Sequence, residues 1–398
     1  MTGLKELEDY REIVGEERVK RIRKKAEPLK DKHIVNINST SNGGGVAGLL
    51  NSIVPLMNSL GIDTGWRIHK GSEGFFKVTK SFHNSLQGEE IDFTNADKKV
   101  YGEWTKFNSR IDHLNDHDLV VVHDPQPLKR VESKTEDQPW IWRCHIDMET
   151  PYKPVLNYLK RFINRYDGVV TTSKLDNIRP KQEIIPPSID PFNSINRPML
   201  PKEVDKKLNE AGIPTDKPII SQVGRFDKWK DPLGVISVWR EVRREVDCSL
   251  VLLGNIASDD PEGPKMFEKV KKEAEKYDDL TVIAESDSSL VNALQRKSDV
   301  VLQKSIKEGF ALTVSEALWK ETPVIGTKVG GIPLQIQDGY NGYLAESDKE
   351  VVLKCIKLLK DRELADKMSL RGKEVVKEHF LITRQLEEWL DVYRQHLI

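Results

Sequence analysis

Short apolar runs recur along the chain at intervals that leave room for a helix between them. In the N-terminal half they read HIVNIN, WRIHK, DLVVVHD, WIWRCHID, GVVTTS and EIIPP, and in the C-terminal half IISQVGRF, CSLVLLGN, LTVIAE, DVVLQKS and TPVIGTKVGG. Several runs are apolar without interruption, as parallel strands are when helices cover both faces of their sheet. The pattern predicts an α/β chain with one set of parallel strands in each half.

A stretch rich in Pro, Asn and Ser separates the two sets of runs. We therefore expect an N-terminal domain over residues 1–190, a linker over 191–215 and a C-terminal domain over 216–379. The 398-residue length also exceeds what one hydrophobic core usually serves. The last segment, 380–398, predicts an amphipathic helix. Its apolar face comprises Ile382, Leu386, Trp389, Leu390, Tyr393 and Leu397.

The composition of the chain limits the kinds of molecule that it is expected to bind. Acidic and basic residues nearly cancel, at 63 against 62, so no global field would attract nucleic acid or an anionic membrane. We expect small-molecule partners. The first 31 residues predict an exposed charged helix and neither a signal peptide nor a membrane span, which favours the cytoplasm. Cys144, Cys248 and Cys355 are far apart, so we expect buried thiols, no disulfide and no structural metal.

Ligands of open parallel sheets bind beyond the carboxyl ends of the strands, so the residues just after each apolar run are the informative ones. Arg225 and Lys230 lie five residues apart after one such run. A planar guanidinium and a mobile ammonium group suit a diphosphate and can neutralise the charge that grows on a phosphate leaving group. The alternative is a solvated basic turn.

The stretch KEGFALTVSEAL places two glutamates, Glu308 and Glu316, eight residues apart. Thr313 and Glu316 fit a capping box, which predicts a helix that starts at Thr313 with its amides facing the loop. Such a helix end attracts phosphate. Glu308 can accept hydrogen bonds from sugar hydroxyls, and Gly309 lets the backbone approach a ligand closely. The alternative for Glu316 is that it only closes the capping box.

Two histidines, His123 and His145, also follow apolar runs. Each suits acid–base work or a hydrogen bond to a substrate, although a structural histidine is the simpler interpretation of either one alone. Asp116 and Asp118 resemble a metal-binding pair, but they precede their strand, so we interpret them as a cap or turn.

The glycine-rich stretch NGGGVAG has Gly43, Gly45 and Gly48 in the spacing of the dinucleotide-binding fingerprint. That fingerprint starts almost directly at the end of its strand and has an acidic residue at the tip of the second strand. Here four residues intervene, and the second run ends in His69 and Lys70. These departures argue against a nicotinamide site.

The stretches NGGGVA, WRCHID, PPSIDP, VGRFDKWKD and KEGFALTVSEAL, taken in this order, resemble the retaining glycosyltransferases of family four. Within them the chain looks most like the glycosyltransferring trehalose synthases, through NSTSNGGGVA, FFKVTKSFHNSLQG, VVHDPQP and PWIWRCHID. The resemblance implies the GT-B fold, in which two Rossmann-like, doubly wound domains face a deep cleft. It also implies that the C-terminal helix, 380–398, joins the N-terminal domain.

The resemblance further implies a role for each matching residue. Arg225, Lys230, Glu308 and His145 would be catalytic, with the two cations on the diphosphate, Glu308 on the donor sugar and His145 beside the transferred sugar. The expected donor and phosphate contacts are Gly43, Gly44, Gly45, Val46, Gly309, Phe310, Ala311, Leu312, Thr313 and Glu316, the last of these on the ribose. The expected acceptor contacts are His83, Asn84, Gln87, Asp124, Gln126 and Asp147.

Two departures from the family pattern stand near these residues. Ala311 occupies a position where many relatives have Gly, and Lys230 is followed by Asp231 instead of Gly. Ala311 would restrict its loop if the backbone there needs a positive φ.

The implied activity is transfer of glucose from a nucleoside diphosphate glucose, with ADP or UDP as the carrier, to free glucose, giving α,α-trehalose with retention. No cofactor is required for catalysis, although Mg²⁺ could accompany the nucleotide. A trehalose phosphorylase, a family-four transferase with another sugar acceptor and a non-catalytic sugar-nucleotide sensor are the alternatives. A homodimer is compatible with the sequence.

Overall fold

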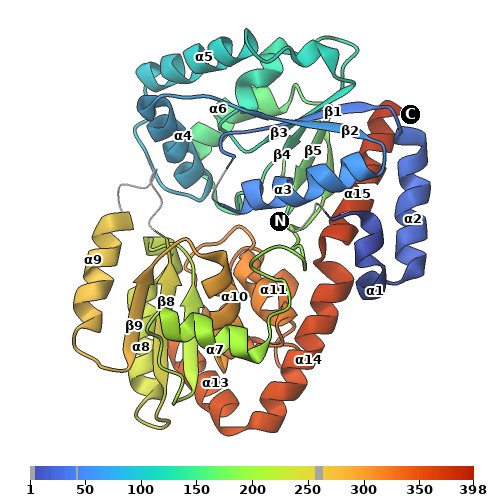
Figure 1. Ribbon diagram of the computed structural model, residues 1–398. Coiled ribbons are helices and arrows are strands. Elements are labelled where there is room, and N and C mark those ends of the chain that lie inside the picture. The colour runs from blue at the N-terminus through green and yellow to red at the C-terminus, as the bar shows by residue number, and fades with distance from the viewer. Residues whose placement is uncertain (1–4, 42–43, 256–262) are drawn as a thin grey trace. The chain divides into compact units, whose positions relative to one another are not determined.

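The computed structural model describes residues 5–41, 44–255 and 263–398. The chain divides into two compact units, the first formed by Met1–Ser188 with Leu381–Ile398 and the second by Ile189–Phe380. Each unit has a six-stranded sheet whose strands pair in parallel and are flanked by helices (Figure 1). The α/β class and the doubly wound sheets predicted from the apolar runs are confirmed.

The sheet of the first unit has the strand order β2-β1-β3-β4-β5-β6. Its strands are β1 (His33–Asn38), β2 (Asp63–Ile68), β3 (Leu119–His123), β4 (Trp140–Arg143), β5 (Gly168–Thr171) and β6 (Lys181–Ile184). Its helices are α1 (Arg11–Val14), α2 (Glu16–Ala26), α3 (Gly44–Ser59), α4 (Glu73–Leu86), α5 (Asn95–Ser109), α6 (Lys153–Ile163) and α15 (Ile382–Leu397). Every residue of β3 and β4 is buried, as expected of central strands covered on both faces.

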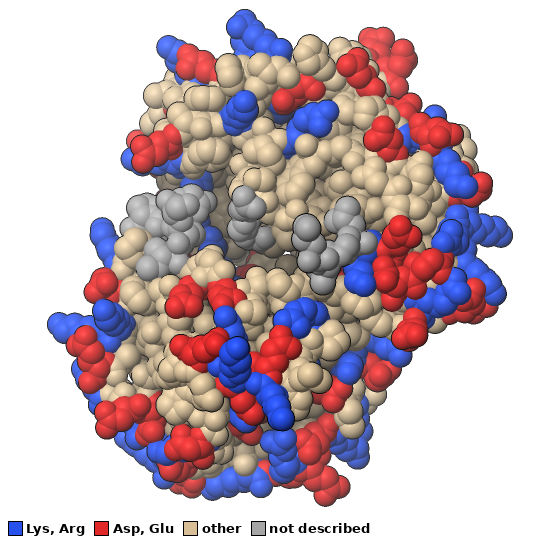
Figure 2. Space-filling view, viewed as in Figure 1, with Lys and Arg blue, Asp and Glu red and all other residues tan. Residues whose placement is uncertain are grey.

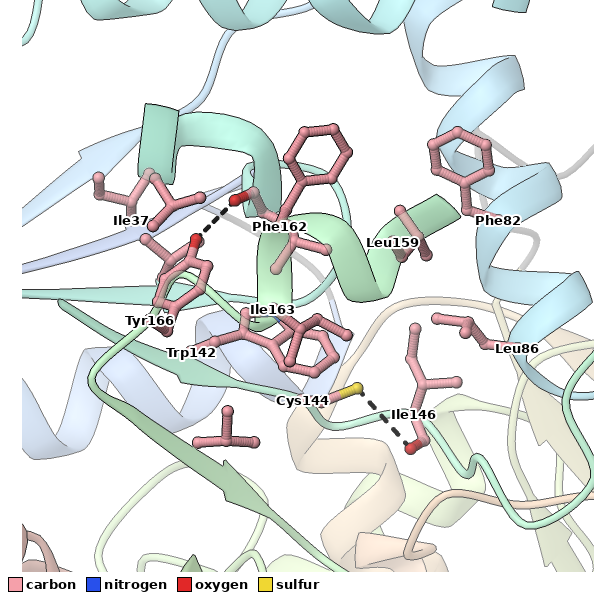
Figure 3. Close-up of a cluster of buried hydrophobic side chains, with 14 of the residues drawn as sticks. Ile37, Phe82, Leu86, Trp142, Cys144, Ile146, Leu159, Phe162, Ile163 and Tyr166 are labelled. Atoms are coloured by element: carbon pink, nitrogen blue, oxygen red, sulfur yellow. Dashed lines mark hydrogen bonds between the residues drawn. The ribbon is translucent and has the colours of Figure 1, made fainter. Parts of the chain in front are cut away.

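Side chains from β4 and α6 form one core of this unit. Figure 3 shows Trp142 beside Ile163 of α6, and Cys144 and Phe162 belong to the same hydrophobic cluster. The Tyr166 hydroxyl donates a hydrogen bond to the Leu128 carbonyl over 2.6 Å, which satisfies its polar end inside this core. The packing holds the end of β4 in place, and the residues that follow β4 include His145.

The C-terminal helix α15 packs against α2 and α3 of the first unit, as the red and blue helices in Figure 1 show for α15 and α2. Five of its predicted apolar residues are buried, and Leu397 is partly exposed. Arg384 anchors the helix, since its Nη2 donates to the carbonyl oxygens of Pro186 at 2.8 Å and Pro187 at 3.1 Å.

The N-terminal segment is less exposed than its charge suggests. Leu7, Tyr10, Val19 and Ile22 are all buried, so α2 has an apolar face in the first unit and is not the fully exposed helix we expected. The apolar residues are too few to stand out among the surrounding charges, which is why the sequence pattern concealed this face.

The sheet of the second unit has the order β12-β11-β10-β7-β8-β9. Its strands are β7 (Ile219–Val223), β8 (Ser249–Gly254), β9 (Leu280–Ala284), β10 (Val300–Gln303), β11 (Val324–Thr327) and β12 (Tyr343–Ala345). Its helices are α7 (Pro201–Glu210), α8 (Pro232–Val242), α9 (Gly263–Ala274), α10 (Ser288–Lys297), α11 (Leu312–Trp319), α12 (Ile332–Gln335), α13 (Asp348–Lys360) and α14 (Arg362–His379). The sequence pattern missed β12, which is too short to form a recognisable apolar run.

The segment over residues 191–215, which we expected to be a linker, belongs to the second unit. Val204 and Leu208 of α7 and Ile213 are buried in a hydrophobic cluster with residues of β7, β8 and α10. A composition rich in Pro and Asn therefore did not distinguish a linker from a helix with a small apolar face.

Charged side chains of both signs are interspersed on the face shown in Figure 2, in keeping with the near-zero net charge. Cys144, Cys248 and Cys355 are buried and free, as predicted. In the part of the chain that the structure describes, no helix is both long enough and apolar enough to cross a membrane.

The packing of α15 predicts that Leu390→Ala destabilises the first unit by about 2–5 kcal/mol, because Leu390 is fully buried and its loss leaves a cavity. Leu353→Ala is the control, since Leu353 on α13 is 58% exposed. Urea unfolding gives the loss of stability, and hydrogen–deuterium exchange by mass spectrometry locates it. Unchanged protection of β1 to β6 in the Leu390 variant would contradict the assignment of α15 to this unit.

Candidate active site

In the second unit, the loops after β7 and β10 carry the predicted donor-binding groups. These two strands are neighbours in the sheet, so their carboxyl ends meet at the same edge. The structure joins Lys230 and Glu308, which are 78 residues apart in the chain, in an ion pair between Nζ and Oε2. Both side chains are mostly buried, with 16% and 14% of their surfaces exposed. Arg225 is more open, and its Nη2 lies 3.3 Å from Asp227 Oδ2.

Hydrogen bonds within the β7–α8 loop fix the backbone of Lys230. Asp227 Oδ1 accepts the amides of Trp229 at 2.9 Å and Lys230 at 3.0 Å. Gln222 Nε2 donates to the Lys230 carbonyl over 2.7 Å. The Ile306 amide donates to the Trp229 carbonyl over 2.7 Å, which ties this loop directly to the loop after β10.

Asp231, which departs from the family pattern, has a left-handed backbone with φ 48° and ψ 51°. Its Oδ1 caps α8 by accepting the Gly234 amide over 3.1 Å, and its Oδ2 pairs with Lys304. Aspartate tolerates this conformation better than most residues because its side chain can bond locally. The substitution therefore keeps the backbone conformation that Gly would provide and adds a helix cap.

Two residues that sequence reasoning missed hold the Glu308 carboxylate. Gln303 Nε2 and Ser305 Oγ each donate to Glu308 Oε2 over 3.3 Å. Gln303 is itself oriented, because its Oε1 accepts a hydrogen bond from Thr313 Oγ1 at 2.7 Å. Both residues stand at the carboxyl end of β10, and that position was the only signal in the sequence that could have found them.

The start of α11 differs from the prediction. The helix begins at Leu312 and its N-cap residue is Ala311, which offers no side-chain cap. The capping box is wrong, since Thr313 donates to Gln303 and Glu316 is buried. Burial raises the pKa of Glu316 and lowers the pKa of Lys320. Because no side chain in the described part of the chain caps α11, its N-terminus keeps the character expected of an anion-binding helix end.

Ala311 adopts φ 64° and ψ 74°, the positive φ that we considered for this position. Its neighbour Phe310 is buried, and both carbonyls accept hydrogen bonds from Gln335 Nε2. An alanine in this region is strained by roughly 1–2 kcal/mol. The surrounding hydrogen bonds hold the loop in a conformation that Ala311 alone would not favour.

A second glycine-containing loop, KVGG after β11, lies against the Glu308–Gly309 backbone and was not predicted as part of the site. A Cβ on Gly330, whose φ is +51°, would stand 1.6 Å from the Glu308 carbonyl oxygen. A Cβ on Gly331 would stand 2.8 Å from the Gly309 carbonyl oxygen. Glycine is thus required here by close approach, and the Gly-Gly pair shortly after a strand was the available signal.

In the first unit, the ends of β3 and β4 bring His123, Asp124 and His145 together. Parallel pairing sets His123 opposite Arg143. His123 Nδ1 lies 3.1 Å from His145 Nε2, and His123 Nε2 lies 3.0 Å from Asn36 Oδ1. Asp124, with φ 64°, accepts the His145 amide at Oδ1 over 2.8 Å. Both the backbone and the ring of His145 are therefore held by residues at the end of β3.

The charges around these histidines favour their neutral forms. Arg143 is fully buried, and none of its three guanidinium nitrogens has a hydrogen-bond partner in the described ranges. Burial, with the Arg143 charge added, lowers the pKa of His123 to about 3 and that of His145 well below its usual range. Burial raises the pKa of Asp124 to about 6.

The other expected residues of the first unit are more dispersed. His83 and Asn84 lie in the last turn of α4, and Gln87 follows it. Gln126 Oε1 is buried and has no hydrogen-bond partner among the described residues, whereas Asp147 Oδ1 accepts the Glu149 amide. Their shared role toward an acceptor stays a prediction.

Of the glycine-rich stretch, Gly43 lies outside the described residues, and Gly44, Gly45 and Val46 form the first turn of α3.

Asp118 lies at the opposite end of the sheet from these groups. Its Oδ2 accepts the His33 amide over 2.7 Å, which agrees with our interpretation of Asp118 as a structural residue.

The left-handed conformation of Ala311 predicts that Ala311→Gly stabilises the second unit by up to about 1 kcal/mol. Relief of the strain outweighs the roughly 0.5–1 kcal/mol of stability that glycine costs because it loses more conformational entropy on folding. Ala317→Gly in the interior of α11 is the matched control and should lose about 1 kcal/mol. Denaturant unfolding measures both, and a loss of stability at both positions would show that Ala311 is not strained.

Comparison with known proteins agrees with the two-unit architecture. A family model described as "Trehalose synthase, N-terminal domain" matches residues 36–175, and one described as "Glycosyl transferases group 1" matches residues 203–375. A trehalose synthase of Thermococcus litoralis is 46% identical over 397 residues, which cover 98% of this chain and 96% of that protein. A trehalose phosphorylase of Grifola frondosa is 29% identical and covers 92% of this chain but only 57% of that protein.

Two solved structures show the fold at low sequence identity. A trehalose-6-phosphate synthase superposes with a TM-score of 0.73 at 13% identity, covering 92% of this chain and 99% of that one. The sucrose-phosphate synthase of Thermosynechococcus elongatus gives 0.72 at 15% identity, with the same coverage. The fold is thus GT-B, and the chain belongs to the trehalose synthase family of glycosyltransferases.

Proposed function

We propose that this protein is a retaining glucosyltransferase that moves an α-glucosyl group from a nucleoside diphosphate glucose to the anomeric hydroxyl of free glucose, forming α,α-trehalose. The carrier is ADP or UDP. Membership of the trehalose synthase family supports trehalose-related glycosyltransfer. The single observation that carries the donor assignment is the contact between Lys230 and Glu308 at the carboxyl ends of β7 and β10.

We assign the donor to the second unit. The pair unites the two groups that a sugar diphosphate requires, since an ammonium binds phosphate oxygens and a carboxylate accepts hydrogen bonds from sugar hydroxyls. Donor binding would separate the pair, with Lys230 turning to the diphosphate beside Arg225 and Glu308 to the glucose. The uncapped first turn of α11 would contact phosphate, and Glu316 would reach the ribose.

We assign the acceptor to the first unit. His145 would lie at the transferred sugar and Asp147 would support that pocket, while His83, Asn84, Gln87, Asp124 and Gln126 would contact the acceptor glucose. Gln126 Oε1, which no described residue satisfies, supports part of this assignment, because a buried amide oxygen without a hydrogen bond is costly unless a ligand provides one.

The proposed chemistry proceeds on one face of the donor sugar. The bond between the anomeric carbon and the phosphate oxygen breaks, and a bond to the acceptor oxygen forms on the same face. The acceptor proton passes to an oxygen of the departing diphosphate. Arg225 and Lys230 stabilise the charge on that diphosphate, so catalysis requires no metal, although Mg²⁺ can accompany the nucleotide.

The proposed function predicts the product of a defined incubation. Glucose and a panel of nucleoside diphosphate sugars should give α,α-trehalose and free nucleoside diphosphate in equal amounts, with turnover persisting in EDTA. Chromatography and NMR of the disaccharide identify the product and its anomeric linkage. Trehalose formed only from glucose 1-phosphate would indicate the phosphorylase suggested by the more distant relatives. A different disaccharide, or binding without turnover, would also overturn the proposal.

Variants of the β7–α8 loop, measured in the same assay, test the proposed diphosphate site. Arg225→Ala and Lys230→Ala should each lower kcat by about 10²–10³, the usual effect of removing one group that stabilises developing charge. Lys228→Ala is the control, because Lys228 stands in the same loop and lies over the Trp229 ring, 4.9 Å from its centroid. Equal effects at all three positions would contradict a specific role for Arg225 and Lys230.

A further inference from the structure

The two histidines at the ends of β3 and β4 form a hydrogen-bonded chain that begins at Asn36 on β1. Their ring planes are nearly parallel, at 14°, and the ring centroids are 5.4 Å apart. With a nitrogen–nitrogen distance of 3.1 Å, the rings meet edge to edge, so the bond lies in the plane of both rings. This is the direction in which imidazole nitrogens donate and accept hydrogen bonds.

The proton positions in this chain follow from the groups at its buried end. The Asn36 side-chain oxygen can only accept, so the proton of His123 is on Nε2. His123 is neutral beside the buried Arg143 guanidinium, and its Nδ1 therefore carries a lone pair. That lone pair must accept a hydrogen bond, and the donor is Nε2–H of His145.

His145 is neutral as well, so a proton on Nε2 leaves a lone pair on Nδ1. The His145 side chain is only partly buried, whereas His123 is 3% exposed. The Asp124 carboxylate holds the His145 backbone amide, and a flip of the His145 ring would break its hydrogen bond to His123. Nδ1 is thus the atom of His145 that can meet a ligand, and it can only accept a hydrogen bond.

We propose that His123 is a positioning residue that fixes His145 in the tautomer protonated at Nε2, so that His145 Nδ1 accepts a hydrogen bond from a hydroxyl of the sugar substrate. The contact with the sugar rests on the proposed function, whereas the tautomer does not. Asn36 sets the direction of these hydrogen bonds. If its amide nitrogen stood in place of its oxygen, both histidines would take the opposite tautomer.

NMR of protein labelled with ¹⁵N in its histidines tests the tautomer without any substrate. Long-range ¹H–¹⁵N correlations distinguish the two neutral forms, and the resonance missing in His145→Gln identifies His145. We expect Nε2–H in the wild-type protein and in His123→Asn, whose side-chain oxygen replaces the accepting Nδ1. His123→Leu should give a mixture of both forms. His117→Asn, at another buried histidine of this unit, is the control and should leave the His145 signals unchanged.

Kinetics with the sugar substrates test the consequence for the reaction. His123→Leu should lower kcat/KM about tenfold, with unchanged affinity for the free nucleoside diphosphate, and His123→Asn should recover most of the loss. A wild-type His145 protonated at Nδ1, or a His123→Leu variant with unchanged tautomer, would overturn the proposal, and the wild-type spectrum decides even if the variant fails to fold. The expected tautomers without trehalose formation would instead refute the proposed function alone.

Discussion

The ion pair between Lys230 and Glu308 is the contact on which the candidate donor site depends. It is mostly buried, and Gln303, Ser305 and the Gly309 amide also donate hydrogen bonds to the Glu308 carboxylate. A buried charge is tolerated only when it is paired and hydrogen-bonded, so loss of either partner would leave the other uncompensated. The pair exists because parallel pairing of β7 with β10 brings two loops, distant in sequence, to one edge of the sheet.

The loops that carry this pair use backbone conformations that ordinary residues avoid. Asp231 and Ala311 are both left-handed, and Gly330 lies where any side chain would collide with the Glu308 carbonyl. Strain of this kind persists where the surrounding structure holds it, and it gathers at functional sites. In the first unit, Asp124 is left-handed beside the two histidines in the same way. The candidate donor site of the second unit and the histidine pair of the first unit therefore both lie on tightly constrained backbone.

Much of the fold could be predicted from the sequence because parallel strands buried on both faces leave continuous apolar runs, as in DLVVVHD and SLVLLG. The cations and the glutamate of the donor site could be found because they directly follow such runs. The pairing of His123 with His145, the support of Glu308 by Gln303 and the burial of Glu316 could not, since each depends on contacts between distant segments. The capping box failed for the same reason, because Thr313 bonds to the end of β10 instead of its own helix.

The most direct test of this account is calorimetric titration of Glu308→Gln with the nucleoside diphosphate and with its glucose conjugate. The substitution preserves size and releases Lys230 from its carboxylate partner. The account predicts that affinity for the free nucleoside diphosphate is kept or increased, while the additional affinity that the glucose provides is lost. An equal loss of affinity for both ligands would contradict the division of labour between Lys230 and Glu308.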